Sequence, residues 1–178
     1  MTEVRVMVDD NLPTGVLEAL REFTFAAFDG RFDEHDWEHT YGGHRVVVFD
    51  GTVPVAAAAV VRRELAVGET TYSVGYVEGV ATAPGRDGQG LGSAVMATVG
   101  DLVRNRYELG ALSTSRHTFY ERLGWERWRG PTYVRHDDGR LERTPDDDGG
   151  VLVLRCPTTE ELDLTASISC EPRAGDDW

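Results

Sequence analysis

The feature that most constrains this fold is a glycine-rich loop that lies between strand-like sequence and an amphipathic helix. Three runs rich in valine, alanine and other small or β-branched residues come first, at 45–49, 53–65 and 71–82, with turn signals between them. The loop at 84–92 follows directly, and apolar residues then recur at helical spacing up to Val103. This order predicts an antiparallel meander whose last strand passes through the loop into a helix.

The rest of the chain alternates between helical and strand patterns, which favours one mixed sheet. Asn11 is expected to cap a helix whose first turn holds Pro13, and Gly124 is expected to end a short helix. Residues 1–178 are predicted to form a single domain of the α+β or α/β class. We expect helices over 13–28, 34–40 and 116–123, strands over 4–8, 109–112, 125–134 and 151–155, a polar loop over 137–150, and an alternating tail over 162–170.

The cysteines and the apolar runs indicate the cellular compartment of the protein. Cys156 and Cys170 can pair, but two thiols in a chain of 178 residues are more typical of reduced core residues in a cytoplasmic protein. The first residues lack the apolar stretch of a signal peptide, and the run at 53–61 is too short to cross a membrane. We therefore expect a soluble, cytoplasmic protein.

The chain is strongly acidic, with a formal net charge of -13 at pH 7. This charge argues against nucleic acid and against an anionic membrane surface as partners, because both would repel an acidic protein. It suits a cationic small molecule, which a negatively charged cleft concentrates. The alternative is that the charge serves only solubility, as it does in many soluble proteins.

The loop from Arg86 to Gly92 has the composition of a phosphate-binding turn. Its glycines let the backbone turn N–H groups inward, and the following helix adds its N-terminal amides, so that together they can bind a pyrophosphate. Arg86 is expected to add a charge-assisted contact. The loop lacks the Gly-Lys-Ser/Thr of a Walker sequence, and the meander before it does not match a dinucleotide-binding βαβ unit. A plain turn is the alternative.

Two segments carry a family resemblance. The run Gly88-Gln89-Gly90-Leu91-Gly92, after Tyr76-Val77-Glu78-Gly79-Val80-Ala81-Thr82, resembles the acetyl-CoA loop of the GNAT superfamily, and Phe119-Tyr120-Glu121-Arg122-Leu123-Gly124-Trp125 resembles its second signature. The resemblance implies a mixed, twisted sheet of about seven strands with about four helices, split between the fourth and fifth strands. It implies acetyl-CoA as cosubstrate, no metal, and coenzyme-binding positions at Val80, Ala81, Thr82, Arg86, Asp87, Gly88, Gln89, Gly90, Leu91 and Gly92.

Further segments resemble the aminoglycoside 2'-N-acetyltransferases, in that family's order along the chain. The resemblance implies direct acetyl transfer to the 2'-amine of an aminoglycoside in a ternary complex, a role in antibiotic resistance, and a homodimer. The segments are Asp36-Trp37-Glu38-His39-Thr40 with Gly42-Gly43, Gly75-Tyr76-Val77-Glu78-Gly79-Val80, Leu109-Gly110-Ala111-Leu112-Ser113, Arg143-Thr144-Pro145-Asp146-Asp147-Asp148-Gly149 and Arg173-Ala174-Gly175-Asp176-Asp177-Trp178.

The same resemblance implies a role for each matching residue. Glu78 corresponds to the base that takes a proton from the acceptor amine through water, and Tyr120 to the acid that protonates the thiolate of coenzyme A. The acceptor is implied to contact Asp147 and the carboxylate of Trp178. The full set of implied acceptor-binding positions is Arg31, Asp36, Glu78, Gly79, Ser113, Asp146, Asp147, Asp176 and Trp178.

The residue types suit this chemistry independently of the resemblance. An amine attacks a thioester only when it is unprotonated, so a nearby carboxylate is useful, and the amide of Val80 can donate to the oxyanion. A tyrosine O–H, with an ordinary pKa of about 10, can protonate a thiolate. The alternatives are that Glu78 faces water on an edge strand, that Tyr120 is a core aromatic, and that residues 146–148 form a solvated loop.

Four features depart from the family pattern, among them Glu171-Pro172, where the family has Asp and an aromatic, and a shorter segment between Ser115 and Tyr120. Arg31 stands where the family has an acid that contacts the aminoglycoside, and Asp87 stands where the family has Arg or Gln. Arg31 motivates a second hypothesis, in which the acceptor is another polyamine or amino sugar. Asp87 motivates a third, in which the chain is a non-catalytic acyl-CoA-binding module. The presence of Glu78 and Tyr120 favours the catalytic hypotheses.

Overall fold

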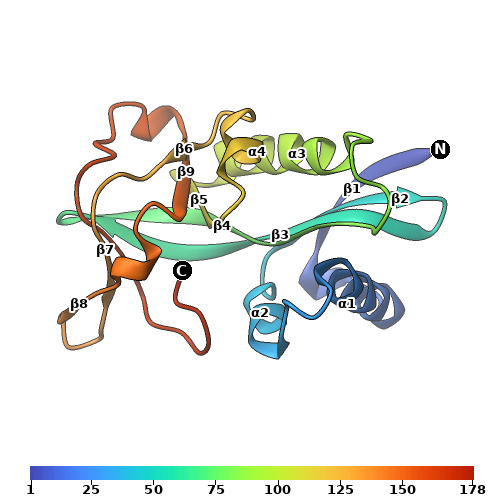
Figure 1. Cartoon of the computed structure of the whole chain (residues 1–178), viewed down its shortest axis with the longest axis horizontal. Coiled ribbons are helices and arrows are strands. Elements are labelled where there is room, and N and C mark those ends of the chain that lie inside the picture. Colours follow the sequence, from blue (N-terminus) through green and yellow to red (C-terminus); the bar gives the residue numbers. More distant parts are fainter. The chain divides into compact units, whose positions relative to one another are not determined.

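The computed structural model describes all 178 residues, and its internal contacts divide the chain into two compact units. Two long strands, β3 (Val53–Val67) and β4 (Thr70–Thr82), pass through both units (Figure 1). The expected mixture of strands and helices is confirmed, although ten strands form rather than about seven, beside four α-helices. The first unit comprises Met1–Val61 and Val77–Asp101, and the second comprises Arg62–Tyr76 and Leu102–Trp178.

The first unit is built on strands in the order β1, β2, β3, all antiparallel to their neighbours. β1 (Thr2–Val8) pairs with β2 (His44–Asp50) along its whole length. β2 pairs in turn with the first half of β3, with a shift of register between Val48 and Phe49. The many valines of these strands pack well on a pleated surface, which explains why the sequence forms strands here.

Helices α1 (Thr14–Phe28) and α2 (Glu34–His39) lie on one side of these strands, and α3 (Leu91–Arg106) begins on the other side (Figure 1). The helical spacing predicted for α1 is confirmed, because Leu20 is buried and its neighbours on the same face pack partly buried beside it. The buried residues on this side of the strands are Leu20, Trp37, Val47, Phe49 and Ala57.

The beginning of α1 differs from the expectation. Asn11 does not cap the helix, because it lies in a 3-10 turn, η1 (Asp9–Asn11), and Pro13 occupies the cap position. The carbonyl of Pro13 accepts the amides of Val16 and Leu17. Proline fits this position because the first residues of a helix have no use for their own N–H groups.

The second unit has the strand order β6-β9-β5-β4-β3-β10-β7-β8. β5 runs parallel to β4, from Val74 opposite Leu109 to Tyr76 opposite Ala111, and antiparallel to β9. The elements are β5 (Leu109–Ser113), α4 (His117–Glu121), β6 (Glu126–Arg127), β7 (Thr132–Arg135), β8 (Leu141–Arg143), η2 (Pro145–Asp147), β9 (Val151–Arg155), η3 (Pro157–Thr159) and β10 (Ile168–Cys170).

The single strand expected over 125–134 is wrong, because the chain leaves the sheet between β6 and β7. Trp128 is buried there, and its Nε1 donates to the carbonyl of Ala166 at 2.9 Å. Gly130 allows a close approach, since a Cβ would come within 1.9 Å of that same carbonyl oxygen. The polar loop expected over 137–150 also needs correction, because it contains β8 and η2. Only β10 of the alternating tail forms a strand.

The remaining expectations concern the state of the two cysteines and the possibility of a membrane-spanning helix. Cys156 and Cys170 are both free and buried, as expected. Burial raises the pKa of each thiol, that of Cys170 to about 12, so neither is an activated nucleophile. None of the helices combines the length and the apolar character that a membrane span requires.

Candidate active site

The loop between β4 and α3 in the first unit has the conformation that its glycines predict. Gly85, Gly88 and Gly90 all have positive φ, at 76°, 75° and 76°. A Cβ at any of them would meet nothing within 4 Å, so glycine is needed for its backbone conformation rather than for space. The amide of Ala94 is the first to donate within the helix, to Gly90. The amides before it therefore remain as donors for an anion at the beginning of α3.

The two charged residues of this loop differ in burial and bonding. Asp87 is exposed to solvent, like Gly88, Gln89 and Gly90 after it. Arg86 is half-buried, and both of its terminal nitrogens donate to Oδ2 of Asp50, at 2.9 and 2.8 Å. The guanidinium is thus bonded to the end of β2, and its contact with a coenzyme stays a prediction.

Gly79, next to the candidate base Glu78, has a φ of +59° inside β4. This left-handed conformation interrupts the extended strand, which is a usual way to re-aim a side chain beside a functional site. A Cβ at Gly79 would lie 3.3 Å from Cγ2 of Thr40 and 3.6 Å from the ring of Phe32. Glu78 itself is half-buried. Thr40 and Phe32 therefore form the support beneath this point of the strand.

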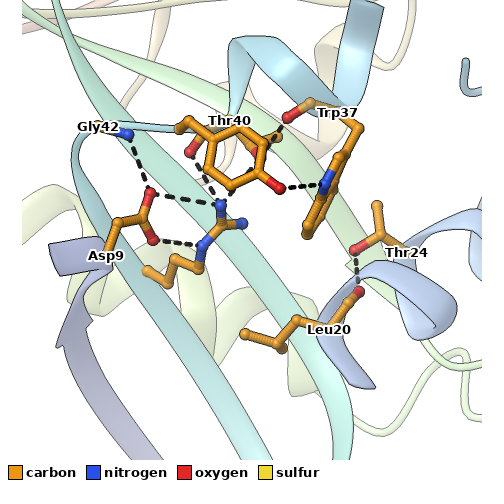
Figure 2. Close-up of polar contacts among 8 residues, drawn as sticks. Asp9, Leu20, Thr24, Trp37, Thr40 and Gly42 are labelled. Atoms are coloured by element: carbon orange, nitrogen blue, oxygen red, sulfur yellow. Dashed lines mark hydrogen bonds and ion pairs between the residues drawn. The ribbon is translucent and has the colours of Figure 1, made fainter. Parts of the chain in front are cut away.

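Thr40 is held in turn by a buried ion pair, which Figure 2 shows. The guanidinium of Arg45 donates from Nε to Oδ1 of Asp9 at 2.6 Å and from Nη2 to Oγ1 of Thr40 at 3.1 Å. The Thr40 hydroxyl donates to the carbonyl of Trp37 at 2.7 Å, and the amide of Gly42 donates to Asp9 (Figure 2). Both carboxylate oxygens of Asp9 and the hydroxyl of Thr40 thus have partners, as burial demands.

A cavity of about 10 Å³ lies against the same cluster. That volume is comparable to the space that one water molecule occupies, and three polar side chains, Thr24, Thr40 and Arg45, line it. It brings the Thr40–Arg45 cluster and Gly79 to one small space in the first unit. Its lining residues are Leu20, Thr24, Trp37, Thr40, Arg45, Ala57, Ala58, Ala59 and Gly79.

The two other acceptor positions of the first unit have local structural roles. The Nε of the exposed Arg31 donates to the carbonyl of Phe28 at 3.1 Å. Asp36 caps α2 together with Asp33, because each carboxylate accepts the backbone amide of the other, at 2.9 and 3.0 Å. The capping role explains why the sequence carries an acid at Asp36, whether or not an acceptor also contacts it.

Tyr120 is the candidate general acid of the second unit. It is 7 % exposed on α4, and the rings of Phe119 and Trp125 contact it edge-on. Burial raises the pKa of its hydroxyl to about 12, against a smaller lowering by Arg116. The phenol therefore keeps its proton at neutral pH, which is the state a general acid requires.

An open hollow of about 240 Å³ lies at the beginning of α4, and the sequence did not predict it. Arg127, on its rim, is bonded to Glu121 at 2.7 Å, and Nε2 of His117 is buried without a hydrogen-bond partner. Its polar lining suits a small polar ligand group, although no sequence pattern marks it. The lining residues are Ser115, Arg116, His117, Thr118, Phe119 and Arg127.

The acidic run at 146–148 separates into two kinds of carboxylate. Asp148 binds Arg143 and also accepts from the amide and hydroxyl of Thr132, which together lower its pKa to about 2. Asp147 behaves in the opposite way, since partial burial raises its pKa, although Thr144 opposes the shift by hydrogen bonding. Asp148 is thus a structural residue, whereas Asp147 lacks a cation.

The charges that surround Asp147 come from the tail as well as from η2. Asp176, Asp146 and Asp177 all raise its pKa by their negative charges, so the four carboxylates share one region of the second unit. Ser113 is exposed where β5 ends, and a Cβ on Gly150 would lie 3.6 Å from its hydroxyl. Trp178 is buried. Such a concentration of acids suits a cationic ligand.

Three comparisons with known proteins address the fold and the family. A family model described as an acetyltransferase (GNAT) domain matches residues 16–128. The GNAT family N-acetyltransferase YhbS from Escherichia coli, solved in complex with CoA, matches with a TM-score of 0.69 and 15% identity over 98% of this chain and 93% of that chain. A GCN5-related N-acetyltransferase from Kribbella flavida matches with a TM-score of 0.57 and 23% identity over 72% of this chain. This chain spans 35% of that longer protein.

The glycine loop leading into α3, the mixed sheet and the family model define the class: the chain belongs to the GNAT acetyltransferases. An aminoglycoside 2'-N-acetyltransferase from Mycolicibacterium fortuitum is 41% identical to it over 98% of this chain and 91% of that protein. Within the class, the chain is a member of the aminoglycoside 2'-N-acetyltransferase family, and the resemblance noted from its sequence is confirmed.

Proposed function

We propose that this protein transfers the acetyl group of acetyl-CoA to the 2'-amino group of an aminoglycoside. The observation that carries the proposal is its 41% identity to the Mycolicibacterium fortuitum enzyme along nearly the whole of both chains. The concentration of negative charge around Asp147 supports a cationic acceptor independently of that likeness.

The first unit supplies the groups proposed to hold the coenzyme. The amides of Gly88 to Gly92 and of the first turn of α3 would bind the pyrophosphate, since no side chain obstructs them. The backbone of Val80, Ala81 and Thr82 would hydrogen-bond the pantetheine arm in the manner of an added strand. Arg86 would add a charge only by exchanging its bonds to Asp50 for bonds to phosphate.

The chemistry proposed is a direct transfer without a covalent enzyme intermediate. The amine nitrogen bonds to the thioester carbonyl carbon, and the carbon–sulfur bond breaks. Glu78 accepts, through water, the proton that the amine loses, and the amide of Val80 donates to the oxyanion. Tyr120 gives its proton to the departing sulfur, and its pKa, raised by burial to about 12, means that it still holds that proton at neutral pH when the thiolate forms. Gly79, Ser113, Asp146, Asp147, Asp176 and Trp178 are the proposed acceptor contacts.

The direct test measures coenzyme A release with gentamicin, tobramycin and kanamycin A as acceptors. We expect turnover with the first two, which carry a 2'-amine, and none with kanamycin A, which carries a hydroxyl there. Glu78→Gln should lower the rate by about 10²- to 10⁴-fold, the usual contribution of a general base. Equal turnover on kanamycin A would contradict the 2' assignment. Calorimetric binding of acetyl-CoA without turnover on any amine would instead support a non-catalytic module.

The exposed cation at Arg31 favours a second candidate acceptor. It stands at a position where an acid is expected to contact the aminoglycoside, and its Nε is bonded to Phe28. A polyamine or amino sugar with fewer charges would tolerate this cation better than an aminoglycoside does. The same assay with spermidine and glucosamine decides between the candidates, because the second requires a higher kcat/KM on one of them than on tobramycin.

We further propose that the enzyme acts in the cytoplasm as a homodimer and confers aminoglycoside resistance. The two free, buried cysteines support a reducing compartment. Light scattering should give twice the mass of one chain, and expression in a susceptible strain should raise the inhibitory concentration of tobramycin but not of kanamycin A. A single-chain mass, or unchanged susceptibility despite activity in vitro, would contradict these additions.

A further inference from the structure

A second buried arginine, Arg63 on β3, makes all its hydrogen bonds to one distant segment. Its side chain is 4 % exposed. Nε donates to Oε1 of Glu171 at 3.2 Å, Nη2 to the carbonyl of Glu171 at 3.0 Å, and Nη1 to the carbonyl of Asp177 at 2.8 Å. The guanidinium also lies over the ring of Tyr76, 4.7 Å from its centre. One side chain thus donates hydrogen bonds to both ends of the segment 171–177. We call this segment the tail loop.

The tail loop is closed on itself as well as bound to Arg63. The amide of Arg173 donates to Oδ1 of Asp177 at 2.9 Å, and its Nε donates to the carbonyl of Asp176 at 2.6 Å. The guanidinium of Arg173 lies 5.4 Å from the centre of the Tyr76 ring. The loop is therefore a compact turn that follows β10 directly and is further attached to the sheet by the Arg63 guanidinium, by Tyr76 and by Sγ of Cys170, which donates to the carbonyl of Asp177 at 3.4 Å.

The position of the tail loop determines which carboxylates reach Asp147. Asp176 and Asp177 both act on the ionisation of Asp147, so they lie within electrostatic reach of η2. Three like charges held near one another repel, and only a fixed backbone keeps them together. Arg63 supplies part of that fixation through its bonds to Glu171 and to the carbonyl of Asp177, and the carboxylate with which it pairs is that of Glu171.

We propose that Arg63 is a positioning residue that holds Asp176 and Asp177 beside Asp147 and thereby sets the affinity for a polycationic acceptor. The acceptor part of this inference rests on the proposed function, whereas the hold on the tail loop does not. An arginine at a core position costs the free energy of desolvating its charge, whereas a methionine would fill similar space without burying a charge. Its value lies in three directed donors that a methionine lacks, all used on the segment that carries the two aspartates.

The test compares Arg63→Met with Arg62→Met, its exposed neighbour on the same strand, in the full-length protein. Hydrogen exchange of the peptide covering 171–178 should speed up at least about tenfold in Arg63→Met, because three donors to the loop are lost. The KM for tobramycin should rise about tenfold or more, with kcat within about threefold and the KM for acetyl-CoA unchanged. Arg62→Met should match the wild type in all of these.

A second variant keeps the test decisive if Arg63→Met does not fold. Arg63→Lys retains the charge but reaches fewer of the three acceptors, so it should show the same changes at a smaller size. Slow exchange of the tail-loop peptide in a folded variant would overturn the hold on the loop, and an unchanged tobramycin KM beside fast exchange would overturn its role in affinity. If the wild type acetylates no aminoglycoside, the proposed function fails, and the exchange measurement still decides whether Arg63 holds the loop.

Discussion

Each unit of this molecule buries one arginine, and the two are neutralised in different ways. Arg45 of the first unit binds Asp9, a carboxylate that is itself only 9 % exposed, and lies against the rings of Trp37 and Tyr41. Arg63 of the second unit binds two backbone carbonyls and Glu171, which is 42 % exposed. The first arrangement is an ion pair buried in the core. The second attaches the partly exposed tail loop to the core.

The difference teaches what each arginine contributes. Removing Arg45 would leave the carboxylate of Asp9 buried without its cation, which is among the costliest changes that a core can suffer. Removing Arg63 would leave Glu171 free to be hydrated, because nearly half of its side chain already meets solvent. We therefore expect global destabilisation in the first case and local loosening in the second.

The largest effect should follow Arg45→Met. We expect a loss of about 3–5 kcal/mol in the free energy of unfolding, because Asp9 keeps a buried charge. Urea unfolding followed by fluorescence measures it. The double variant Arg45→Met with Asp9→Leu should recover part of the loss, since no charge then remains unpaired. A loss below about 1 kcal/mol would show that the pair is hydrated and would remove the contrast with Arg63.

The next largest effect is on kcat and concerns Tyr120. Aromatic packing, rather than an arginine, holds this residue in place. Tyr120→Phe should lower kcat by about 10²-fold while leaving the KM values nearly unchanged, because only the proton donor is lost. A circular dichroism spectrum like that of the wild type would confirm that the fold is retained. An unchanged kcat would mean that another group, or water, protonates the thiolate.

The raised pKa of Tyr120 also predicts a pH dependence with a definite sign. The folded protein holds this proton up to about pH 12, whereas an unfolded tyrosine loses it near its ordinary pKa of about 10. Its contribution to stability is therefore intact below about pH 10 and lost as pH rises to about 12. Tyr120→Phe should flatten that alkaline fall in thermal stability, and kcat should show no fall caused by Tyr120 below about pH 10.

A smaller effect should follow Gly79→Ala, because the added methyl group would press on Thr40, the residue that Arg45 holds in place. Alanine at a φ of +59° carries backbone strain, and its Cβ would press on Thr40 at 3.3 Å. We expect a loss of about 1–3 kcal/mol in stability and a fall in kcat, because the strand beside Glu78 must shift. Gly68→Ala, at a φ of +57° with nothing within 4 Å of an added Cβ, carries similar strain without the neighbours and serves as a matched control whose kcat should change less.

The smallest effect on global stability should be that of Arg63→Met. We expect a loss of about 1–2 kcal/mol, since the carboxylate that loses its partner, Glu171, is 42 % exposed. Urea unfolding of this variant beside Arg45→Met gives the comparison directly. Equal losses in the two variants would mean that the tail loop is part of the cooperative core rather than a segment attached to it.

The sequence predicted the parts of the fold that local patterns govern. The periodicity of α3 and the strand runs of β2, β3 and β4 marked these elements within a few residues of their observed bounds. The interruption between β6 and β7 at Trp128 could not be predicted, because the hydrogen-bond partner of Trp128, Ala166, lies 38 residues further along the chain. Local periodicity has no access to such a contact.

The candidate site was predicted unevenly for the same reason. Motif resemblance supplied Glu78, Gly79, Tyr120 and the glycine loop, whose roles stay predictions. It could not supply Arg63, which lies in an apolar run like any surface arginine, with acceptors 108 and 114 residues away. Nor could it show that Asp148 is committed to Arg143, since a run of three aspartates looks uniform in sequence.

The central claim is that the enzyme acetylates one amine of an aminoglycoside, the one at the 2' position. The most direct measurement is the NMR spectrum of tobramycin after a single turnover with acetyl-CoA, which locates the new amide. The account predicts one acetyl group, on the 2' nitrogen, absent from the Glu78→Gln reaction at the same time point. An acetyl group on any other nitrogen, or a mixture of sites, would contradict it.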